Sequence, residues 1–375
     1  MIKKKNISSF ELAVLEKELQ FLVDGKISQI YHPNKKEIIF QVYARGKGKL
    51  LLRIIPGKFL NIVDKKETVL RPSGYCMQLR KYLNNSYIKL VYQKDSERIL
   101  IIVLENAIKI SDNEKKIVRY NLVIEFFSKG NLLITDEDWK IIGTLSSQRW
   151  ESRTIKNREQ YQFPPNGFDW KNLKIKQVQE IVKSSEKKNL ATCLATELSL
   201  GGVVAEEVCK LKNIDYKKLP SEIKSKEIKE VCKSIKEILE LVDNEKTKAY
   251  LFDDGSSFPL KLFNRNVKQE FENYNLLLSL VNPFEKISPY QQKINAMNKI
   301  ISQQEGSIKE IERSIIINTS KGDKIYSDYS KIQKLLEIVK ELKKEKGWNE
   351  VKTVLEKEKK IVKVDLKNKK VLLNL

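Results

Sequence analysis

The chain of 375 residues contains one histidine and four cysteines. The cysteines lie far apart in the sequence: Cys76, Cys193, Cys209 and Cys232. This spacing argues against a Cys₄ or Cys₂His₂ zinc site and implies no disulfide framework. One imidazole leaves little scope for acid–base catalysis by histidine. Because His32 precedes Pro33, we expect it in a solvated loop without a catalytic role.

Signatures of common enzymes and of membrane proteins are also missing. The sequence has no Walker phosphate loop, no Gly-x-Gly-x-x-Gly turn and no Gly-x-Ser-x-Gly elbow. No stretch reaches the roughly eighteen uncharged apolar residues of a transmembrane helix. The basic start, residues 1–6, is not followed by the apolar segment of a secretory signal. We therefore expect a cytoplasmic protein with no catalytic site of its own, no cofactor and no membrane partner.

Acidic side chains are scarce relative to basic ones. The chain has 71 Lys and Arg against 49 Asp and Glu, a formal net charge of +22. Such an excess favours polyanionic partners, although a genome rich in lysine codons would produce part of it. Residues 38–61 contain five basic residues, residues 68–93 contain four, and neither window contains an acid. These windows predict a basic face in the N-terminal part of the chain.

Residues 1–172 predict an α+β domain with a mainly antiparallel sheet. Apolar residues at helical spacing indicate a first helix over residues 7–23, capped by Ser8 or Ser9. Two alternating strands, 38–43 and 50–55, flank a turn at 45–49, and a short helix is expected over 74–83. Further strands are expected, in the spacing of a meander, over residues 88–92, 99–105, 118–127, 131–135 and 140–145. The domain ends near Pro164-Pro165, where the pattern breaks.

Residues 173–244 predict a second, helical domain. Residues 194–209 combine an apolar helix, a turn at Gly201-Gly202 and a second helix. A helix-hairpin-helix unit of this kind exposes backbone N–H groups that can hold a phosphate. An ordinary helical hairpin with a glycine turn has the same pattern, and the sequence leaves both interpretations open.

Residues 245–375 predict a middle domain with a small β element and an antiparallel coiled coil over about residues 286–346. A β-hairpin is expected over 249–263, and weak alternation predicts another over 362–375. A glycine turn at 321–323 would separate the two long helices, which would also permit self-association. The expected heptad seam comprises Ile294, Met297, Ile301, Ile308, Ile311 and Ile315. Since no clear cap closes the chain, we expect either a truncated protein or one that lacks a final domain.

Several blocks of sequence carry a resemblance that spans nearly the whole chain. They are residues 7–19, 30–31, 71–83 and 124–134, Arg153, residues 161–165, Gly201-Gly202, and residues 271–274, 321–329 and 347–348. In this order they resemble the NFACT family, which includes the bacterial RqcH proteins, the eukaryotic NEMF proteins and proteins formerly described as fibronectin-binding. The resemblance implies an N-terminal domain related in fold to formamidopyrimidine DNA glycosylases, then the helix-hairpin-helix domain and the coiled-coil middle domain. The family's C-terminal RNA-binding domain, NFACT-R, is expected to be absent.

The resemblance also implies a role in ribosome-associated quality control. Family members bind a large ribosomal subunit that carries peptidyl-tRNA, and they recruit charged tRNA, alanyl-tRNA in the bacterial members. The stalled chain is then extended without mRNA, by peptide-bond chemistry that belongs to the ribosome. Expected partners are therefore large-subunit rRNA and tRNA, and the alternative is a ribosome- or tRNA-binding factor without tailing activity. A repair glycosylase would need a Pro-Glu start where Ile2 and Lys3 stand, and a surface adhesin would need an export signal.

Functional residues carry over from the family with two departures. The family's first-helix Asp falls on Glu11, and its Asp-Arg pair falls on Glu97 and Arg98, so both Asp positions are Glu here. The longer side chain shifts the geometry of any contact with tRNA. The alternative for Glu11, Arg80 and Lys81 is that they lie on a solvated helix face. The alternative for Arg98 is an ordinary surface charge. Cys76 and Met77 are expected to pack in the interior rather than to bind RNA. The candidate RNA-binding residues are Glu11, Arg80, Lys81, Glu97, Arg98, Gly201 and Gly202.

Overall fold

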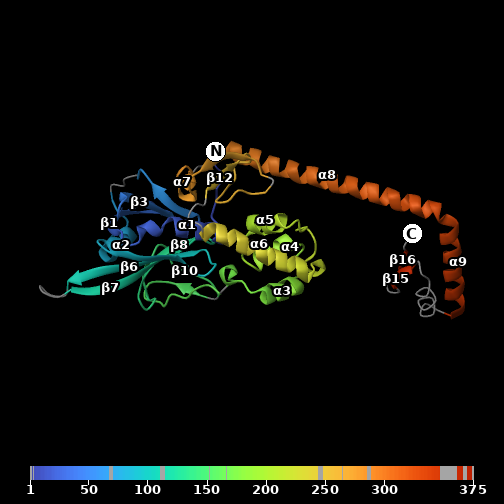
Figure 1. Ribbon diagram of the computed structural model, residues 1–375, viewed down its shortest axis with the longest axis horizontal. Coiled ribbons are helices and arrows are strands. Elements are labelled where there is room, and N and C mark those ends of the chain that lie inside the picture. The colour runs from blue at the N-terminus through green and yellow to red at the C-terminus, as the bar shows by residue number, and fades with distance from the viewer. Residues whose placement is uncertain are drawn as a thin grey trace. The chain divides into compact units, whose positions relative to one another are not determined.

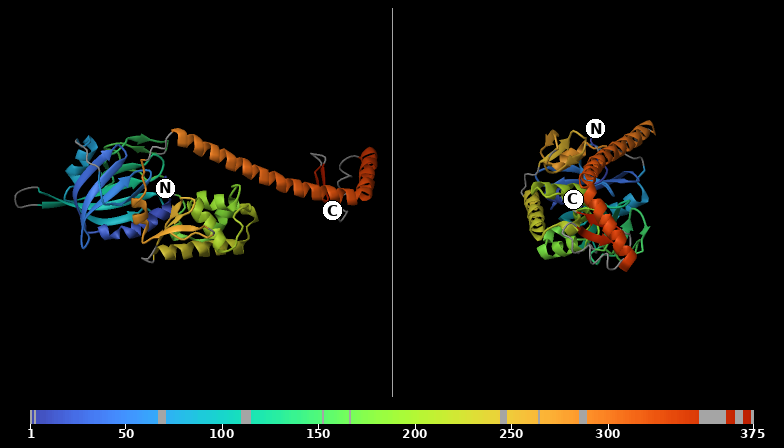
Figure 2. Two further views of the ribbon diagram at one scale, coloured as in Figure 1. Left: turned by 90° about the horizontal axis from the view of Figure 1, so that it is seen from above. Right: turned by 90° about the vertical axis from the view of Figure 1, so that its right-hand side faces the viewer.

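A computed structural model describes residues 2, 4–66, 71–109, 115–151, 153–165, 167–243, 248–263, 265–284, 289–346, 361–365 and 370–373. The chain divides into two compact units, Met1–Phe284 and Glu285–Leu375. Sheets and short helices make up the first unit, and two long helices with a β-hairpin make up the second (Figures 1 and 2). The predicted mixed α+β class is confirmed. The two boundaries between the three predicted domains stay predictions.

A nine-stranded antiparallel sheet is the largest sheet of the first unit (Figure 1). Its strand order is β4-β3-β2-β1-β5-β6-β7-β8-β9. Its strands are β1 Lys26–Asn34, β2 Glu37–Ala44, β3 Gly48–Ile55, β4 Phe59–Val63, β5 Tyr87–Gln93, β6 Ile99–Lys109, β7 Lys115–Glu125, β8 Asn131–Asp136 and β9 Ile141–Thr144. Seven of these were predicted, and β1 and β4 were missed. Placing His32 in a loop was wrong, because it lies on β1. Pro33 is tolerated there since the pairing of β1 with β2 is irregular between Tyr31 and Asn34.

Local capping chemistry sets the first helix, α1 (Ser9–Glu18). Ser8 is its N-cap and forms a capping box with Glu11. Leu12 and Leu15 are buried against the inner face of the sheet. The helix is shorter than predicted, because the chain continues as a separate 3₁₀ turn, η1 (Gln20–Leu22).

The second helix, α2 (Gly74–Leu83), was predicted with these bounds, and Ser73 caps it. It packs through Cys76, Leu79 and Leu83, so the expected packing role of Cys76 is confirmed. The same expectation for Met77 was wrong, because 52% of its surface is exposed. Met77 follows Cys76 by one position and therefore points away from the buried helix face.

The opposite, outer face of the sheet has its own smaller core. Residues of β6 to β9 pack there against the segment that carries β10 (Gln148–Arg149) and β11 (Thr154–Ile155). A buried polar network fixes this segment: Arg153 donates to Glu125 Oε1 at 2.8 Å, and the Tyr161 hydroxyl donates to the same oxygen at 2.9 Å. The Arg153 guanidinium also stacks over the Trp150 ring at 4.6 Å.

The predicted helical segment follows as α3 (Ile175–Ser184), α4 (Leu190–Thr196), α5 (Gly202–Leu211) and α6 (Ser225–Asp243), with 3₁₀ turns η2 (Trp170–Asn172) and η3 (Pro220–Glu222). These helices share one hydrophobic core with the inner face of the sheet and with α1. A three-stranded sheet comes next, formed by β12 (Ala249–Phe252), β13 (Ser257–Phe258) and β14 (Val267–Phe271). It confirms the hairpin predicted over 249–263. The short helix α7 (Tyr274–Ser279) then packs on α1 and β4.

The second unit contains α8 (Pro289–Ser327), α9 (Tyr329–Lys346) and the hairpin of β15 (Ile361–Asp365) with β16 (Lys370–Leu373). The terminal hairpin was predicted. The predicted interruption at 321–323 was wrong, because α8 continues through Gly322, and one glycine costs a helix only about 1 kcal/mol. Ile301, Ile308 and Ile315 of the expected seam are exposed by 50–58%, so the coiled coil is not confirmed. Among the described helices, none is both long and apolar enough to cross a membrane.

The buried Arg153–Glu125 pair makes a prediction about stability. Replacing Arg153 by Ala leaves the Glu125 carboxylate buried without its cation, which should lower the free energy of unfolding by roughly 3–5 kcal/mol. Lys218→Ala removes the cation of a partly exposed pair with Glu227 and should cost less than about 1 kcal/mol. Urea unfolding followed by circular dichroism measures both. If Arg153→Ala and Lys218→Ala lowered the free energy of unfolding equally, the structural role of the buried network would be contradicted.

Candidate RNA-binding cleft

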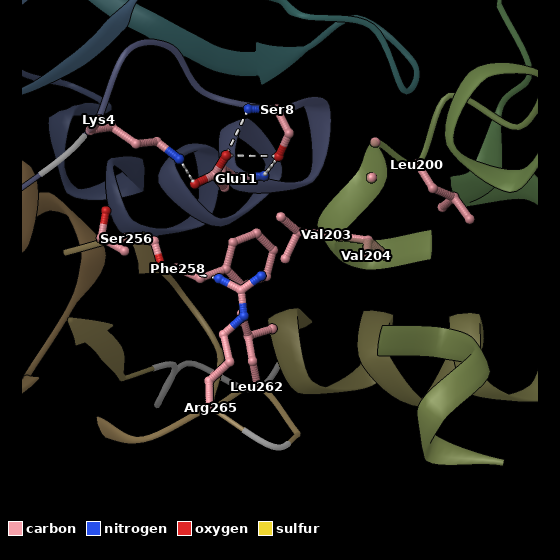
Figure 3. A pocket seen from close by; sticks show the side chains of 13 residues that line it. Lys4, Ser8, Glu11, Leu200, Val203, Val204, Ser256, Phe258, Leu262 and Arg265 are labelled. Atoms are coloured by element: carbon pink, nitrogen blue, oxygen red, sulfur yellow. Dashed lines mark hydrogen bonds and ion pairs between the residues drawn. The ribbon is translucent and has the colours of Figure 1, made fainter. Parts of the chain in front are cut away.

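The start of α1 lies at the centre of the candidate site. Glu11 is only 3% exposed, so the interpretation of this residue as a solvated helix position was wrong. Its Oε2 accepts hydrogen bonds from the backbone N–H and the hydroxyl of Ser8, at 2.8 and 2.9 Å. Its Oε1 accepts from the Lys4 ammonium and from the Tyr274 hydroxyl (Figure 3 shows the Lys4 and Ser8 contacts). The Glu11 carboxylate therefore has four donors from within the chain.

Helix α7 is attached to α1 through Tyr274, which is fully buried. Besides its bond to Glu11, Tyr274 donates its backbone N–H to Glu18 Oε1 at 2.7 Å, and Asn275 N–H donates to Glu18 Oε2 at 2.8 Å. Glu18 thus occupies the positive N-terminal end of α7. Burial raises the pKa of Glu18 to about 7, although these two backbone donors oppose the shift.

A tight loop before β6 carries the second pair of candidate residues. The buried amide of Gln93 donates to Ser9 O at 2.8 Å and to Glu97 O at 2.7 Å, which ties this loop to the start of α1. The Glu97 carboxylate accepts the Gly167 N–H at 2.9 Å. A Cβ at Gly167 would lie 2.8 Å from Ser199 Oγ and 2.9 Å from that carboxylate oxygen, so a larger residue would require these two side chains to shift. The loop thereby places Arg98 beside α1.

The turn between α4 and α5 forms the third wall. Ser199 adopts a positive φ of 55° and Gly201 one of 76°, and Gly201 is the N-cap of α5. The Ser9 hydroxyl donates to Ser199 O at 3.1 Å and accepts from the Trp170 indole at 3.2 Å. The Ser9 hydroxyl therefore joins α1 both to this turn and to Trp170 of η2.

Two adjoining clefts open where these walls meet, and both are lined by Ser8 and Gly201. The first has a volume of about 180 Å³ and is lined by Glu11, Gly202, Phe258 and Arg265 among others (Figure 3). The second has a volume of about 360 Å³ and is lined by Ser9, Ser96, Glu97, Arg98, Ala195, Thr196 and Ser199 besides the shared pair. Five of the seven candidate residues thus line one continuous region: Glu11, Glu97, Arg98, Gly201 and Gly202.

The charges of this region suit an anion. Burial lowers the pKa of the Arg98 guanidinium, against the influence of the neighbouring Glu97, but the group stays protonated at neutral pH. None of the described residues accepts a hydrogen bond from it. The N-terminus of α5 has no side-chain cap, so its first N–H groups and its dipole face the cleft. A phosphate is the ligand that a free guanidinium and an uncapped helix start recognise together.

Arg80 and Lys81 lie outside this region, on α2. The Arg80 guanidinium donates twice to Ile30 O, at 2.8 and 2.7 Å, and so fixes α2 to β1. Lys81 is exposed, with its ammonium 5.4 Å from the centre of the Tyr82 ring. Their contact with phosphates stays a prediction, and it would have to occur on a separate surface.

Sequence reasoning missed several residues that line the cleft or hold its walls: Lys4, Gln93, Ser199, Arg265 and Tyr274. Tyr274 contacts Glu11 although 263 positions separate them, and no local pattern could have paired them. Gln93 follows the strand predicted over 88–92 and was given no role. In the parts of the chain that the structure describes, no group of three His, Cys, Asp or Glu side chains is arranged to hold a metal ion.

Comparison with known sequences adds a family to this geometry. A family described as "NFACT N-terminal and middle domains" matches residues 8–372. The "Archaeal Rqc2 homolog aRqcH" of Methanocaldococcus jannaschii is 24% identical, across 95% of this chain and 55% of the relative. The human "Ribosome quality control complex subunit NEMF" is 21% identical, across 93% of this chain and 35% of the relative. The chain therefore spans about half the length of the archaeal relative.

Solved structures support the fold over about three quarters of the chain. The crystal structure of the fibrinogen binding protein from Staphylococcus aureus aligns with a TM-score of 0.60 at 18% identity, over 73% of this chain and 97% of that one. The N-terminal part of the fibronectin/fibrinogen-binding protein from Streptococcus suis gives 0.58 at 23% identity, with the same coverage. A formamidopyrimidine DNA glycosylase from Lactococcus lactis reaches only 0.31, so the expected relation to that fold stays a prediction.

The Glu18 carboxylate makes the contact of α7 with α1 sensitive to pH. Its folded-state pKa of about 7 lies above the ordinary value of 4.5. Between these values the folded chain keeps a proton that the unfolded chain has released, so the free energy of unfolding falls as the pH rises through this window. As the pH rises from about 4.5 to about 7, the free energy of unfolding of the wild type should fall by up to about 3 kcal/mol more than that of Glu18→Gln.

Urea unfolding at several pH values between about 4.5 and 8 measures this difference. Glu240→Gln is the control, because Glu240 is an exposed residue of α6. Its pH dependence should match that of the wild type. If the curves of Glu18→Gln and the wild type ran parallel, the assigned role of Glu18 would be refuted.

Proposed function

The chain belongs to the NFACT family, in its N-terminal and middle domains, and from this premise we propose that it acts in ribosome-associated quality control as an RNA-binding factor. Relatives named for that process occur in archaea, bacteria and eukaryotes. In the proposed role the chain binds a large ribosomal subunit that carries peptidyl-tRNA. It recruits a charged tRNA, alanyl-tRNA if it follows the bacterial members, for extension of the stalled chain without mRNA.

The observation that carries this proposal is the Arg98 guanidinium without a hydrogen-bond partner among the described residues, in one cleft with the uncapped start of α5. Gly201, the N-cap of α5, lines the same cleft as Arg98, and in the proposed role the guanidinium and the start of α5 contact the RNA backbone together. The net charge of +22 adds a long-range attraction for RNA. Both donors read the backbone of a nucleic acid, so they hold tRNA through phosphates and shape.

In this role the chain supplies positioning, and the ribosome supplies the peptide-bond chemistry. The carboxylates of the cleft fit such a division of labour, because Glu11 is engaged by Ser8, Lys4 and Tyr274, and Glu97 by Gly167. The four donors on Glu11 suit a positioning role better than that of a general base. A ribosome- or tRNA-binding factor without tailing activity is the alternative, and it would use the same cleft.

The proposal predicts the RNA that accompanies the protein in its own cells. The tagged chain is purified at low salt from cells that express the wild type, Arg98→Ala or the control Arg149→Ala, and the co-purifying RNA is sequenced. Arg149 is an exposed arginine of β10. The wild type and the control should both enrich large-subunit rRNA and tRNA. Arg98→Ala should retain at least about tenfold less tRNA than the wild type, because it lacks a charge-assisted hydrogen bond to the RNA.

The outcomes separate the two functions. One selected tRNA species together with large-subunit rRNA supports the quality-control role and identifies the amino acid. Large-subunit rRNA without a selected tRNA supports the factor without tailing. RNA no richer than that of an unrelated basic protein would contradict both.

A further inference from the structure

A row of charged and aromatic side chains crosses the outer face of the large sheet. Directly paired residues on neighbouring antiparallel strands lie on the same face. Tyr43 of β2 pairs with Lys49 of β3 and with Lys26 of β1. Lys26 pairs with Tyr87 of β5, Tyr87 with Glu105 of β6, and Glu105 with Arg119 of β7. The row is therefore Lys49-Tyr43-Lys26-Tyr87-Glu105-Arg119, one residue from each of six adjacent strands.

The two tyrosines of this row are exposed to an unusual degree for large side chains. Tyr43 is 63% exposed and Tyr87 is 47% exposed. The Lys26 ammonium lies 5.9 Å from the centre of the Tyr87 ring. Since Lys26 lies on the strand between them, the two tyrosines are separated by two strand spacings, roughly 10 Å. Leu90 and Ile117, exposed by 57% and 66%, extend the apolar surface on the same face.

Basic groups exceed acidic ones along the row. Lys26, Lys49 and Arg119 face a single acid, Glu105, which accepts from Arg119 Nε at 2.8 Å and lies 4.0 Å from Lys89. The Glu105 charge is thus matched by two cations, and Lys26 and Lys49 form no ion pair with a described residue. Tyr43 therefore lies between these two cations, Lys49 and Lys26. Tyr87 lies between Lys26 and the neutralised Glu105.

We propose that this face binds single-stranded RNA, with unpaired bases stacked on Tyr43 and Tyr87 and phosphates held by Lys26 and Lys49. Flat aromatic side chains that alternate with cations on an open sheet are how proteins bind unpaired nucleotides, because every base has a face to stack. A protein partner fits less well, since interface cores are depleted in lysine. A duplex fits less well, since its bases are stacked on one another and cannot reach the rings.

This surface is separate from the cleft at Arg98. The outer face lies opposite α1, which packs on the inner face with Val42 and Ile102. The inference therefore goes beyond the proposed function and does not depend on it. It gives the first unit a second RNA-binding surface, toward unpaired segments of the same RNA or of a neighbouring one.

The test measures fluorescence anisotropy of a labelled single-stranded RNA of about twelve nucleotides, and of the same sequence as a duplex, with the full chain. All proteins carry Arg98→Ala, so that the cleft does not mask the sheet. Tyr43→Leu with Tyr87→Leu removes the rings but keeps apolar side chains on the strands. The matched control is Tyr326→Leu with Tyr329→Leu, two tyrosines of the second unit that are exposed by 81% and 59%.

The double Tyr43/Tyr87 variant should bind the single strand at least about fivefold more weakly for each ring removed. The control pair should bind like the parent, and the duplex should respond little to either change. Lys26→Gln with Lys49→Gln should lower affinity and reduce the slope of log K against log salt by about 0.7 for each phosphate that the protein no longer neutralises. Circular dichroism and urea unfolding confirm that each variant is folded.

Single-strand affinity that is unchanged in the folded Tyr43/Tyr87 variant would overturn the proposal. Equal losses of affinity for single strand and duplex would overturn it as well, since they would show that charge alone attracts RNA. A protein that co-purifies with the parent and is missing from this variant, while RNA affinity stays constant, would assign the face to a protein partner instead.

Discussion

The buried carboxylate of Glu11 joins three segments that are distant in the sequence: the N-terminal segment through Lys4, the start of α1 through Ser8, and α7 through Tyr274. An unpaired carboxylate in such a place would be strongly destabilising, because burial removes its hydration. Four donors offset that cost and make the position of each segment depend on the others. The α4–α5 turn then contacts the same helix through Ser9, and the loop of Arg98 contacts it through Gln93. The geometry of the cleft therefore depends on this buried group.

In the proposed role, this arrangement explains how a surface for RNA can contain carboxylates. Glu11 and Glu97 keep their charges engaged by donors of the chain, and the free positive potential comes from Arg98 and from the start of α5. A phosphate that enters meets donors whose orientation is already fixed, so little ordering remains to oppose binding. The Glu11 side chain reaches both Lys4 and Tyr274. We infer that Glu11 acts by positioning the cleft walls.

The elements that could be predicted are those set by neighbours in the sequence. The cap at Ser8, the turn at 45–49 and the helix Gly74–Leu83 depend on residues a few positions apart, and their patterns were sufficient. Strand β1 was missed because Pro33 suggested a loop, although an irregular pair in the sheet accommodates it. The break at Gly322 was wrong because one glycine does not outweigh a long helix. For the cleft, the family resemblance supplied Glu11, Glu97, Arg98 and the glycine turn. Tyr274 and Ser199 could not be predicted, since their roles arise from contacts between distant segments.

The most direct test of the cleft is a change at Gly202, the first residue of α5, where an added side chain meets no atom within 4 Å. Gly202→Asp places a negative charge at the positive end of the helix, which should stabilise the fold by about 0.3–1 kcal/mol. The same charge should repel a phosphate and weaken tRNA binding about fivefold or more. Gly202→Ala is the control, which should favour the helix without changing the charge. The account predicts that Gly202→Asp is more stable than the wild type and binds tRNA more weakly, whereas Gly202→Ala binds tRNA normally. Unchanged tRNA affinity in a stabilised Gly202→Asp would contradict the account.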